Sequence, residues 1–279
     1  MPSDEKEDLL KLINASGFLF QLRVEDEVMK TSSTHGTTVL AKEHKWVDET
    51  TGNEGFIDLI LAFGTNGKMV VECKKVTDAT WLFLVPNDSK TVKKANILWS
   101  YKFEDDRQVA ARDKLQLNPE SMESSFCIVR GQGEKDQPML ERISDFLLQS
   151  TECLAAEEQN YPRYSALAGI RFYLSLIVTT AKLKISKCDF SKIDLSTGQI
   201  ADAEFEDVPF VRFTKSMSTR LPSSKSPQDL SESEKENRRT VFVINSDNLS
   251  KILSCKWEFE GKKSHDEAWP WELPIWKQS

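Results

Sequence analysis

Several features that mark common classes of protein are missing from this chain of 279 residues. Its five cysteines are scattered and never spaced as CxxC, which argues against both a disulfide framework and a structural zinc site. The three histidines are too few and too dispersed for a histidine-based catalytic site. No apolar run approaches the roughly 18 residues of a membrane-spanning helix, so we expect no membrane association. The acidic N-terminus, residues 1–8, is unlike a signal peptide, and we therefore expect a cytoplasmic protein.

The chain also lacks an excess of positive charge, because its formal net charge is −7. A generic nucleic-acid-binding protein is usually basic, so this balance counts against a long positively charged surface. It does not exclude a nuclease, since a local groove and a bound cation can oppose the overall field. Three basic clusters are candidates for phosphate contacts, with an ordinary solvated surface as the alternative: Lys90, Lys93 and Lys94; Arg212 and Lys215; and Arg238 with Arg239.

Three charged residues interrupt two short apolar segments. Asp58 lies within residues 56–63, and Glu72 and Lys74 lie within residues 69–75. Both segments have the pattern of buried strands, where a charged side chain is costly unless it is paired or binds a metal. A plain cross-strand ion pair would account for Asp58 alone. Two acids and a lysine together favour a divalent-metal site for phosphodiester cleavage.

The register of the predicted hairpin decides whether these three side chains meet. Side chains alternate along a strand, so Glu72 and Lys74 share a face. A three-residue loop at residues 65–67, with its last residue left-handed, pairs Ile60 with Glu72 and Asp58 with Lys74. A two-residue loop would leave Asp58 on the face opposite Glu72. We predict the three-residue loop, which gathers all three charges.

The chemistry explains why these residue types are needed. Mg²⁺ prefers oxygen ligands, which Asp58 and Glu72 supply, with the backbone carbonyl of Cys73 as a further ligand. The Cys73 side chain should face away from the site. A bound Mg²⁺, or Mn²⁺ in its place, lowers the pKa of a water and offsets charge on the phosphate. Lys74 can position or deprotonate that water, or neutralise the phosphate.

These residues, Asp58…Glu72-Cys73-Lys74, resemble the PD-(D/E)XK signature of restriction-endonuclease-like nucleases found in bacterial restriction and defence proteins. The resemblance covers about residues 18–85, with a weaker match of strand and helix order up to about residue 160. Ile57 stands where the motif has proline, at a position that varies in the family. The resemblance implies an α/β fold with a restriction-endonuclease-like core, which is a mixed central sheet flanked by helices.

The resemblance also implies an acidic residue on a helix before the sheet. Leu22, Glu25 and Met29 fall on one face of the predicted helix, so Glu25 borders an apolar stripe. Glu25 is therefore the candidate that completes or supports the catalytic site. Gln21 is the rival for that position, where a glutamine would orient water rather than bind metal.

The remaining pattern predicts the domain organisation. We expect a nuclease-like core over residues 1–160 and a β-rich C-terminal portion over residues 161–279, packed on the core or extending it. Residues 216–239 are rich in Ser, Lys, Glu and Pro, and we expect a mobile loop there. Residues 103–124 are polar and are expected to be partly helical. Helices are predicted at 5–14, 18–30, about 138–158 and from about residue 246, and strands at 37–46, 81–85, 126–130, 171–178, 208–214 and 240–245. The tryptophan-rich tail at residues 269–276 is expected to pack back on the body.

The predicted function is that of a metal-dependent endonuclease which hydrolyses DNA, with RNA as an alternative substrate. The setting in bacterial restriction or defence follows from the resemblance alone. The other hypothesis is a catalytically inactive module of the same fold that binds nucleic acid or a partner protein. Because one active site per chain cuts one strand, a homodimer would suit cleavage of both strands.

Overall fold

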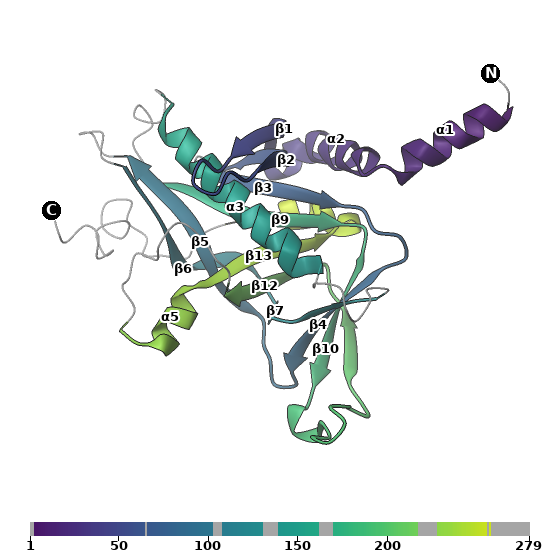
Figure 1. The fold of residues 1–279 in the computed structure, drawn as a ribbon, viewed down its shortest axis with the longest axis vertical. Coiled ribbons are helices and arrows are strands. Elements are labelled where there is room, and N and C mark those ends of the chain that lie inside the picture. Colours follow the sequence, from purple (N-terminus) through teal and green to yellow (C-terminus); the bar gives the residue numbers. More distant parts are fainter. Residues whose placement is uncertain are drawn as a thin grey trace.

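The computed structural model describes residues 3–64, 66–102, 108–130, 139–161, 170–216, 228–255 and 257. Its main feature is a mixed sheet with helices on both faces, which confirms the expected α/β class with a mixed central sheet (Figure 1). Along the sheet lie β1 (Thr38–Val47), β2 (Glu54–Phe63), β3 (Gly67–Lys74), β9 (Arg171–Thr179), β13 (Arg238–Asn245), β12 (Phe210–Ser216) and β7 (Glu123–Ser124). A hairpin of β5 (Val92–Lys102) and β6 (Gln108–Ser121) joins the sheet through β9.

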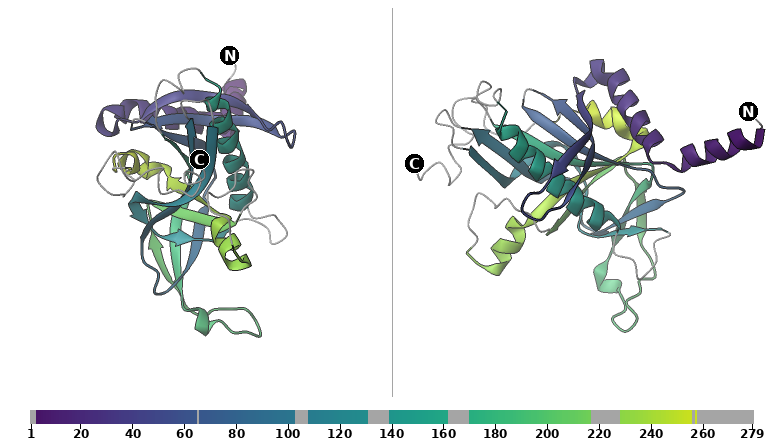
Figure 2. Two further views of the ribbon diagram at one scale, coloured as in Figure 1. Left: turned by 90° about the vertical axis from the view of Figure 1, so that its left-hand side faces the viewer. Right: turned by 45° about the horizontal axis from the view of Figure 1, so that its top comes forward.

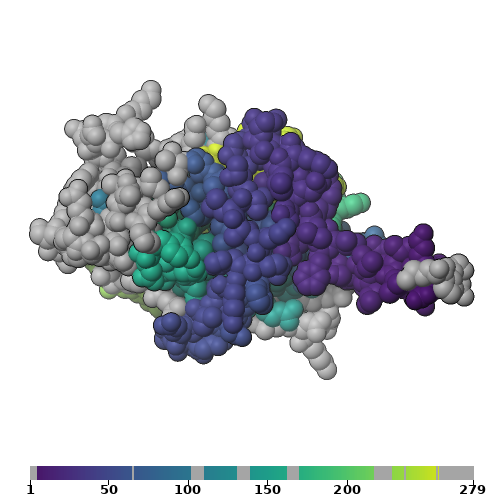
Figure 3. Space-filling model, turned by 90° about the horizontal axis from the view of Figure 1, so that it is seen from above, coloured from purple at the N-terminus to yellow at the C-terminus, as the bar shows by residue number. Residues whose placement is uncertain are grey.

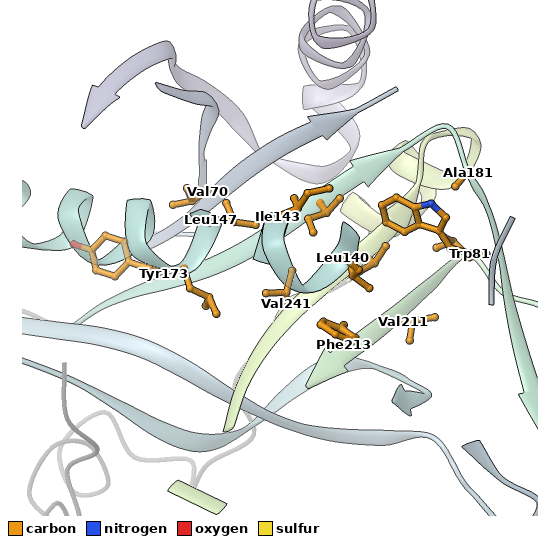
Figure 4. Close-up of a cluster of buried hydrophobic side chains, with 14 of the residues drawn as sticks. Val70, Trp81, Leu140, Ile143, Leu147, Tyr173, Ala181, Val211, Phe213 and Val241 are labelled. Atoms are coloured by element: carbon orange, nitrogen blue, oxygen red, sulfur yellow. The ribbon is translucent and has the colours of Figure 1, made fainter. Parts of the chain in front are cut away.

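Helices pack on both faces of this sheet. The helix α2 (Phe18–His35) contributes Val24 and Val28 to the core on one side, where α6 (Leu249–Leu253) also packs. The helix α3 (Met139–Gln159) covers the other side, as predicted from its apolar spacing. Figure 4 shows this second core, in which α3 side chains lie against those of the strands: Leu140, Ile143 and Leu147 of α3, with Val70, Tyr173, Phe213 and Val241.

The order of the strands joins distant parts of the chain. The strands β1, β2 and β3 are antiparallel neighbours, whereas β9 lies parallel to β3 and pairs with it along its whole length. Parallel neighbours need a crossover connection, and α3 lies within it. Because β9, β12 and β13 belong to the same sheet as β1–β3, the predicted C-terminal portion extends the sheet of the predicted core.

A second sheet of four strands begins where the chain continues beyond the C-terminal ends of β3 and β9. It contains β11 (Glu204–Asp207), β10 (Lys182–Cys188), β4 (Thr80–Pro86) and β8 (Cys127–Val129) in that order, and a short helix η1 (Phe190–Lys192) follows β10. Trp81 and Phe83 of β4, with Leu183 and Ile185 of β10, are buried in the same core as α3. The second sheet is thus anchored on the main one.

The expectation of partly helical structure over residues 103–124 is wrong. The described part of that stretch, residues 108–124, forms β6 and β7. Charged residues hide the strand pattern, because Arg112 and Asp113 are buried with partners of their own. Arg112 Nε donates to Glu152 at 3.1 Å, and Trp99 Nε1 donates to Asp113 at 2.6 Å.

The predicted loop at residues 216–239 is partly structured. Residues 217–227 lie outside the described residues, but Leu230–Glu236 form the helix α5, so the loop prediction is wrong there. The Asp229 side chain caps α5 by accepting from the Glu232 amide at 2.8 Å. The helix predicted from about residue 246 begins with the short helix η2 (Ser246–Asn248), and the Asn245 side chain caps it by accepting from the Asp247 amide at 3.0 Å. The tail at residues 269–276 lies outside the described residues.

The N-terminal helix α1 (Ser3–Ala15) confirms the helix predicted at residues 5–14 and projects away from the sheets (Figure 2). In the part of the chain that the structure covers, no helix combines the length and the apolar character that crossing a bilayer requires.

Candidate functional site

The hairpin between β2 and β3 has an odd-numbered loop. Pairing continues to Phe63 opposite Gly67, so the loop consists of residues 64–66. It has the predicted length of three residues but begins one position earlier. Gly64, with φ of 54°, takes the left-handed backbone that was expected of Gly67, and glycine adopts that conformation at little steric cost.

This register places Asp58 opposite Glu72. The ladder pairs Leu59 with Val71, and one further step brings the two acids into opposition, so their side chains leave the same face of the sheet. Lys74 shares that face, because it lies two residues beyond Glu72. The predicted gathering on one face is therefore present. The predicted pairing of Asp58 with Lys74 is wrong, because the earlier start of the loop shifts the register by two residues.

Cys73 faces the other way. Its side chain is buried in the core on the α2 side, and burial raises the pKa of its thiol well above the ordinary value, which argues against a nucleophilic role. The orientation predicted for this side chain is thus confirmed. Its backbone amide donates to Asp58 Oδ2 at 2.7 Å and so fixes that carboxylate against β3. The proposed use of its backbone carbonyl as a metal ligand stays a prediction.

The two carboxyl groups are electrostatically coupled. Burial, with a contribution from the Glu43 carboxylate, raises the pKa of Asp58 to about 6, while the Cys73 amide and the Lys74 charge act in the opposite direction. Burial and the Asp58 carboxylate raise the pKa of Glu72 to about 7, again partly offset by Lys74. Like charges have such effects only at close range. The ionised site is therefore short of positive charge.

Glu43 is a third acid at this site that the sequence did not reveal. The ladder between β1 and β2 includes Lys42 and His44, so Glu43 between them stands opposite Asp58. Its φ of 49° is unusual for a residue with a side chain, and such backbone strain is concentrated at functional sites. The Glu43 carboxylate also raises the pKa of Glu72. No local signal marks it, because the register of β1 is not set by a tight turn.

The helix α2 brings Gln21 to these acids. Gln21 Nε2 donates to the backbone oxygen of Asp58 at 3.0 Å and to Glu43 Oε1 at 2.5 Å. Glu25, one turn further along, is bound instead by Lys42, with 3.0 Å between Glu25 Oε1 and Lys42 Nζ. Of the two rivals on α2, Gln21 therefore contacts the site directly, whereas Glu25 borders it through a surface lysine.

The burial of α2 explains this placement. The helix turns Gln21, Val24 and Val28 towards the sheet. The apolar stripe of Leu22 and Met29, which the sequence suggests as the buried face, is exposed. Because the stripe points outwards, Glu25 is carried away from the centre of the site.

The donor chemistry of the site suits a hard divalent cation. Asp58, Glu72 and Glu43 offer only oxygen atoms, and Mg²⁺ commonly uses one or two protein carboxylates together with waters and substrate phosphate. Among the described residues, no three Asp, Glu, His or Cys side chains form a metal-binding group by themselves. The case for a divalent cation therefore rests on the facing carboxylates of Asp58 and Glu72, whose negative charge the nearby Lys74 only partly offsets.

Several residues of the predicted basic clusters are buried or paired within the protein. Arg212 is fully buried and donates to Ser121 Oγ at 2.7 Å and to the backbone oxygens of Leu117 and Pro119 at 2.7 and 2.8 Å. Both readings of Arg212, as a phosphate contact and as a solvated charge, are wrong for that reason. Lys215 Nζ pairs with Glu141 at 2.6 Å, and Arg239 is also buried.

Comparison with known proteins adds no family assignment. No protein-family model, curated protein or solved structure matches the chain. The geometry around Asp58 and Glu72, with the resemblance of the short motif, is therefore the basis for a functional proposal.

Proposed function

We propose that this protein is a metal-dependent endonuclease that hydrolyses DNA phosphodiester bonds. The observation that carries the proposal is the placement of Asp58 opposite Glu72, with Lys74 on the same face. A mixed sheet between helices agrees with the restriction-endonuclease-like core that the motif implies. A setting in bacterial restriction or defence follows from the resemblance.

Each residue at the site has a distinct role in this proposal. Asp58 and Glu72, with the Cys73 carbonyl, would hold Mg²⁺ or Mn²⁺, and Glu43 would add negative charge beside them. When bound, the metal supplies a water of lowered pKa and stabilises charge on the phosphate. The Lys74 side chain would orient that water as an ammonium or accept its proton as a neutral amine. Gln21 holds the Glu43 carboxylate and the Asp58 backbone in place.

The metal-free protein should lose stability as the pH rises. A carboxyl group whose pKa is higher in the folded state binds more protons when folded, so its contribution is fully present below its unfolded pKa and is lost above its folded pKa. For Asp58 and Glu72, with ordinary values of 3.8 and 4.5 and folded values of about 6 and 7, the loss falls between about pH 4 and pH 8. We expect a decrease on the order of 3 kcal/mol for the pair after solvent screening.

Urea denaturation across this pH range measures the effect. Asp58→Asn and Glu72→Gln should each flatten the profile relative to wild type. At neutral pH, Mg²⁺ at 100 times its dissociation constant should restore about 2.7 kcal/mol to the wild type and less to either variant. Parallel pH profiles in wild type and both variants would contradict the electrostatic coupling, and equal Mg²⁺ effects would contradict metal binding.

Gln21 and Glu25 should differ in their effect on the site. Gln21→Ala removes both hydrogen bonds to the cluster, and we expect cleavage to fall by about 10- to 100-fold. Glu25→Ala breaks a surface ion pair with Lys42 and should change cleavage by less than about threefold. The rates are measured at saturating Mg²⁺. If the Glu25 variant lost more activity than the Gln21 variant, the helix acid implied by the motif would be the better assignment.

A cleavage assay with the full chain tests the proposal. Supercoiled plasmid, single-stranded DNA and RNA are incubated with Mg²⁺, with Mn²⁺ and with a chelator. Metal-dependent cleavage of DNA supports the proposal, and cleavage of RNA alone would change the substrate. Tight binding with no cleavage of any nucleic acid would favour the inactive module instead.

A further inference from the structure

The second sheet has one face in the core and one face in solvent. Trp81 and Phe83 of β4, with Leu183 and Ile185 of β10, lie in the core beside α3. Because side chains alternate along a strand, the residues between them point away from the core. We define the outer face by side chains of this kind on β4, on or beside β8, and at the start of β10: Leu82, Leu84, Phe126, Ile128, Arg130 and Lys182.

The outer face belongs to a part of the molecule that projects from the body. Figures 1 and 2 show the strands of the second sheet extending away from the main sheet. The side seen in Figure 3 is formed largely by the N-terminal helices and strands instead. The projecting sheet therefore presents a surface that the helices of the main sheet do not cover.

The apolar part of the outer face is exposed. Ile128 of β8 lies opposite Leu82 of β4, and the Leu84 amide donates to the Phe126 backbone oxygen at 3.1 Å, so Phe126 is the neighbour of Leu84. Phe126 is 62% exposed and Ile128 is 53% exposed. An aromatic ring thus stands open to solvent beside a row of aliphatic side chains.

Two cations border this apolar part. Arg130 follows Val129, and Lys182 precedes Leu183. Both apolar neighbours lie in the core, so alternation turns the two cations to the outer face, where both are exposed. They flank Thr80, because Lys182 pairs with Thr80 and the Arg130 amide donates to its backbone oxygen at 3.1 Å. Within the described ranges neither cation pairs with a carboxylate, whereas the other lysines of β10 are paired with acids of β11.

The end of the outer face that carries these cations is joined to the proposed active site. Lys74 is the last residue of β3, and the Thr180 amide donates to its backbone oxygen at 3.3 Å. Thr180 Oγ1 also donates to the backbone oxygen of Val76 at 2.8 Å. Lys182 lies two residues beyond Thr180, which is roughly 7 Å of extended backbone. The outer face therefore begins beside the end of the strand that carries Glu72 and Lys74.

The chemistry of the outer face fits a single-stranded nucleic acid. Cations contact phosphates and an exposed aromatic ring stacks on an unpaired base, whereas the bases of a duplex are already stacked on one another. A protein partner would need apolar side chains for Phe126 and carboxylates for Arg130 and Lys182. A single strand supplies both kinds of contact in every nucleotide.

The acidic strand β11 limits the path of such a ligand. Glu204, Glu206 and Asp207 of β11 are all exposed. Asp207 lies opposite Lys184 and pairs with it at 2.8 Å. Because these acids repel phosphate, the favoured path follows β4 and β8, and Phe205 of β11 lies outside it.

We propose that the outer face binds a single-stranded segment of nucleic acid, with Phe126 stacked on a base and Arg130 and Lys182 in contact with phosphates. As a statement about the substrate, the inference rests on the proposed function, because it gives the nuclease a preference for unpaired segments. The binding itself requires no cleavage and can be measured separately.

Fluorescence anisotropy with the full chain tests the inference. A labelled single strand of about 15 nucleotides and its duplex are titrated in the presence of a chelator, so that no metal-dependent cleavage occurs. Wild type should bind the single strand at least about 10-fold more tightly than the duplex. Phe126→Ala should weaken single-strand binding by about 10-fold. Arg130→Ala and Lys182→Ala should each lower the slope of log affinity against log salt by about 0.7.

Two variants serve as matched controls. Phe205 is 61% exposed and belongs to the same sheet, but it lies on the acidic strand, so Phe205→Ala should stay within about twofold of wild type. Lys114 is an exposed residue of β6, and Lys114→Ala should leave the salt slope unchanged. Urea denaturation checks that every variant is folded.

Equal affinity for single strand and duplex would overturn the inference, and so would wild-type affinity in a folded Phe126→Ala protein. Absence of binding to any nucleic acid would overturn it as well and would leave the outer face to a protein partner. The cleavage assay keeps the two proposals apart. Binding through the outer face without cleavage supports the inference and not the nuclease, whereas metal-dependent cleavage with unchanged affinity in Phe126→Ala does the reverse.

Discussion

Asp58→Asn and Lys74→Ala are each expected to reduce the rate of metal-dependent cleavage by about 10³-fold or more. Asp58→Asn keeps the shape of the side chain but removes the charge that would hold the metal, and its amide cannot reproduce two carboxylate oxygens. Lys74→Ala removes the cation on the face that Asp58 and Glu72 share, which also raises the pKa of both acids further. Cleavage rates on plasmid DNA, at several Mg²⁺ concentrations, measure both losses.

Lys45→Ala is the matched control for these variants. Lys45 is an exposed residue of β1 that pairs with Glu54 at 3.1 Å. We expect its cleavage rate to stay within about twofold of wild type, because exposed ion pairs contribute little. Unfolding curves must show that all three variants remain folded. Retained cleavage in a folded Asp58→Asn or Lys74→Ala protein would refute the assignment of the site.

Arg212→Ala should destabilise the fold by roughly 3–5 kcal/mol. The substitution leaves the Leu117 and Pro119 backbone oxygens and the Ser121 hydroxyl without their donor inside the protein. It also opens a cavity beside the Phe242 ring, whose centroid lies 5.2 Å from Arg212 Cζ. Burial lowers the pKa of Arg212 to about 10, so the guanidinium is still charged at neutral pH and depends on these acceptors. Urea denaturation measures the loss.

Arg238→Ala serves as the comparison, because Arg238 belongs to another of the basic clusters but is exposed. Its stability should change by less than about 0.5 kcal/mol. Arg212→Lys should fall between wild type and Arg212→Ala, since lysine keeps the charge but not the planar fork of donors. If Arg212 instead contacted phosphate, its removal would weaken the salt dependence of DNA binding and leave stability unchanged.

The parts of the site that could be predicted from the sequence are local. Asp58 and Glu72 are joined by a hairpin whose loop is three residues long, so the turn chemistry was enough to place both on one face. The exact position of the loop within residues 64–67 could not be predicted, because Gly64 and Gly67 can both take the left-handed backbone. The long apolar spacing of α3 likewise marked a helix against the sheet.

The parts that could not be predicted depend on contacts between distant residues. Glu43 reaches Asp58 only through the register of β1, which a connection over residues 48–53 leaves open. Gln21 reaches the site because α2 buries the face that carries Gln21 and exposes the face that carries Leu22 and Met29. The sequence of the helix alone does not show which of these two faces packs on the sheet. The hairpin of β5 and β6 was missed because buried charges interrupt its apolar pattern.

The position of β9 has a consequence for how the protein is made. The strand that carries Glu72 and Lys74 is completed on one side by residues 171–179, about 100 residues later in the chain. Until those residues leave the ribosome, β3 is an open edge that can pair with other chains. Pairing over such a distance also slows folding. A fragment that stops near residue 160 would keep every candidate catalytic residue and still present them on an unfinished sheet.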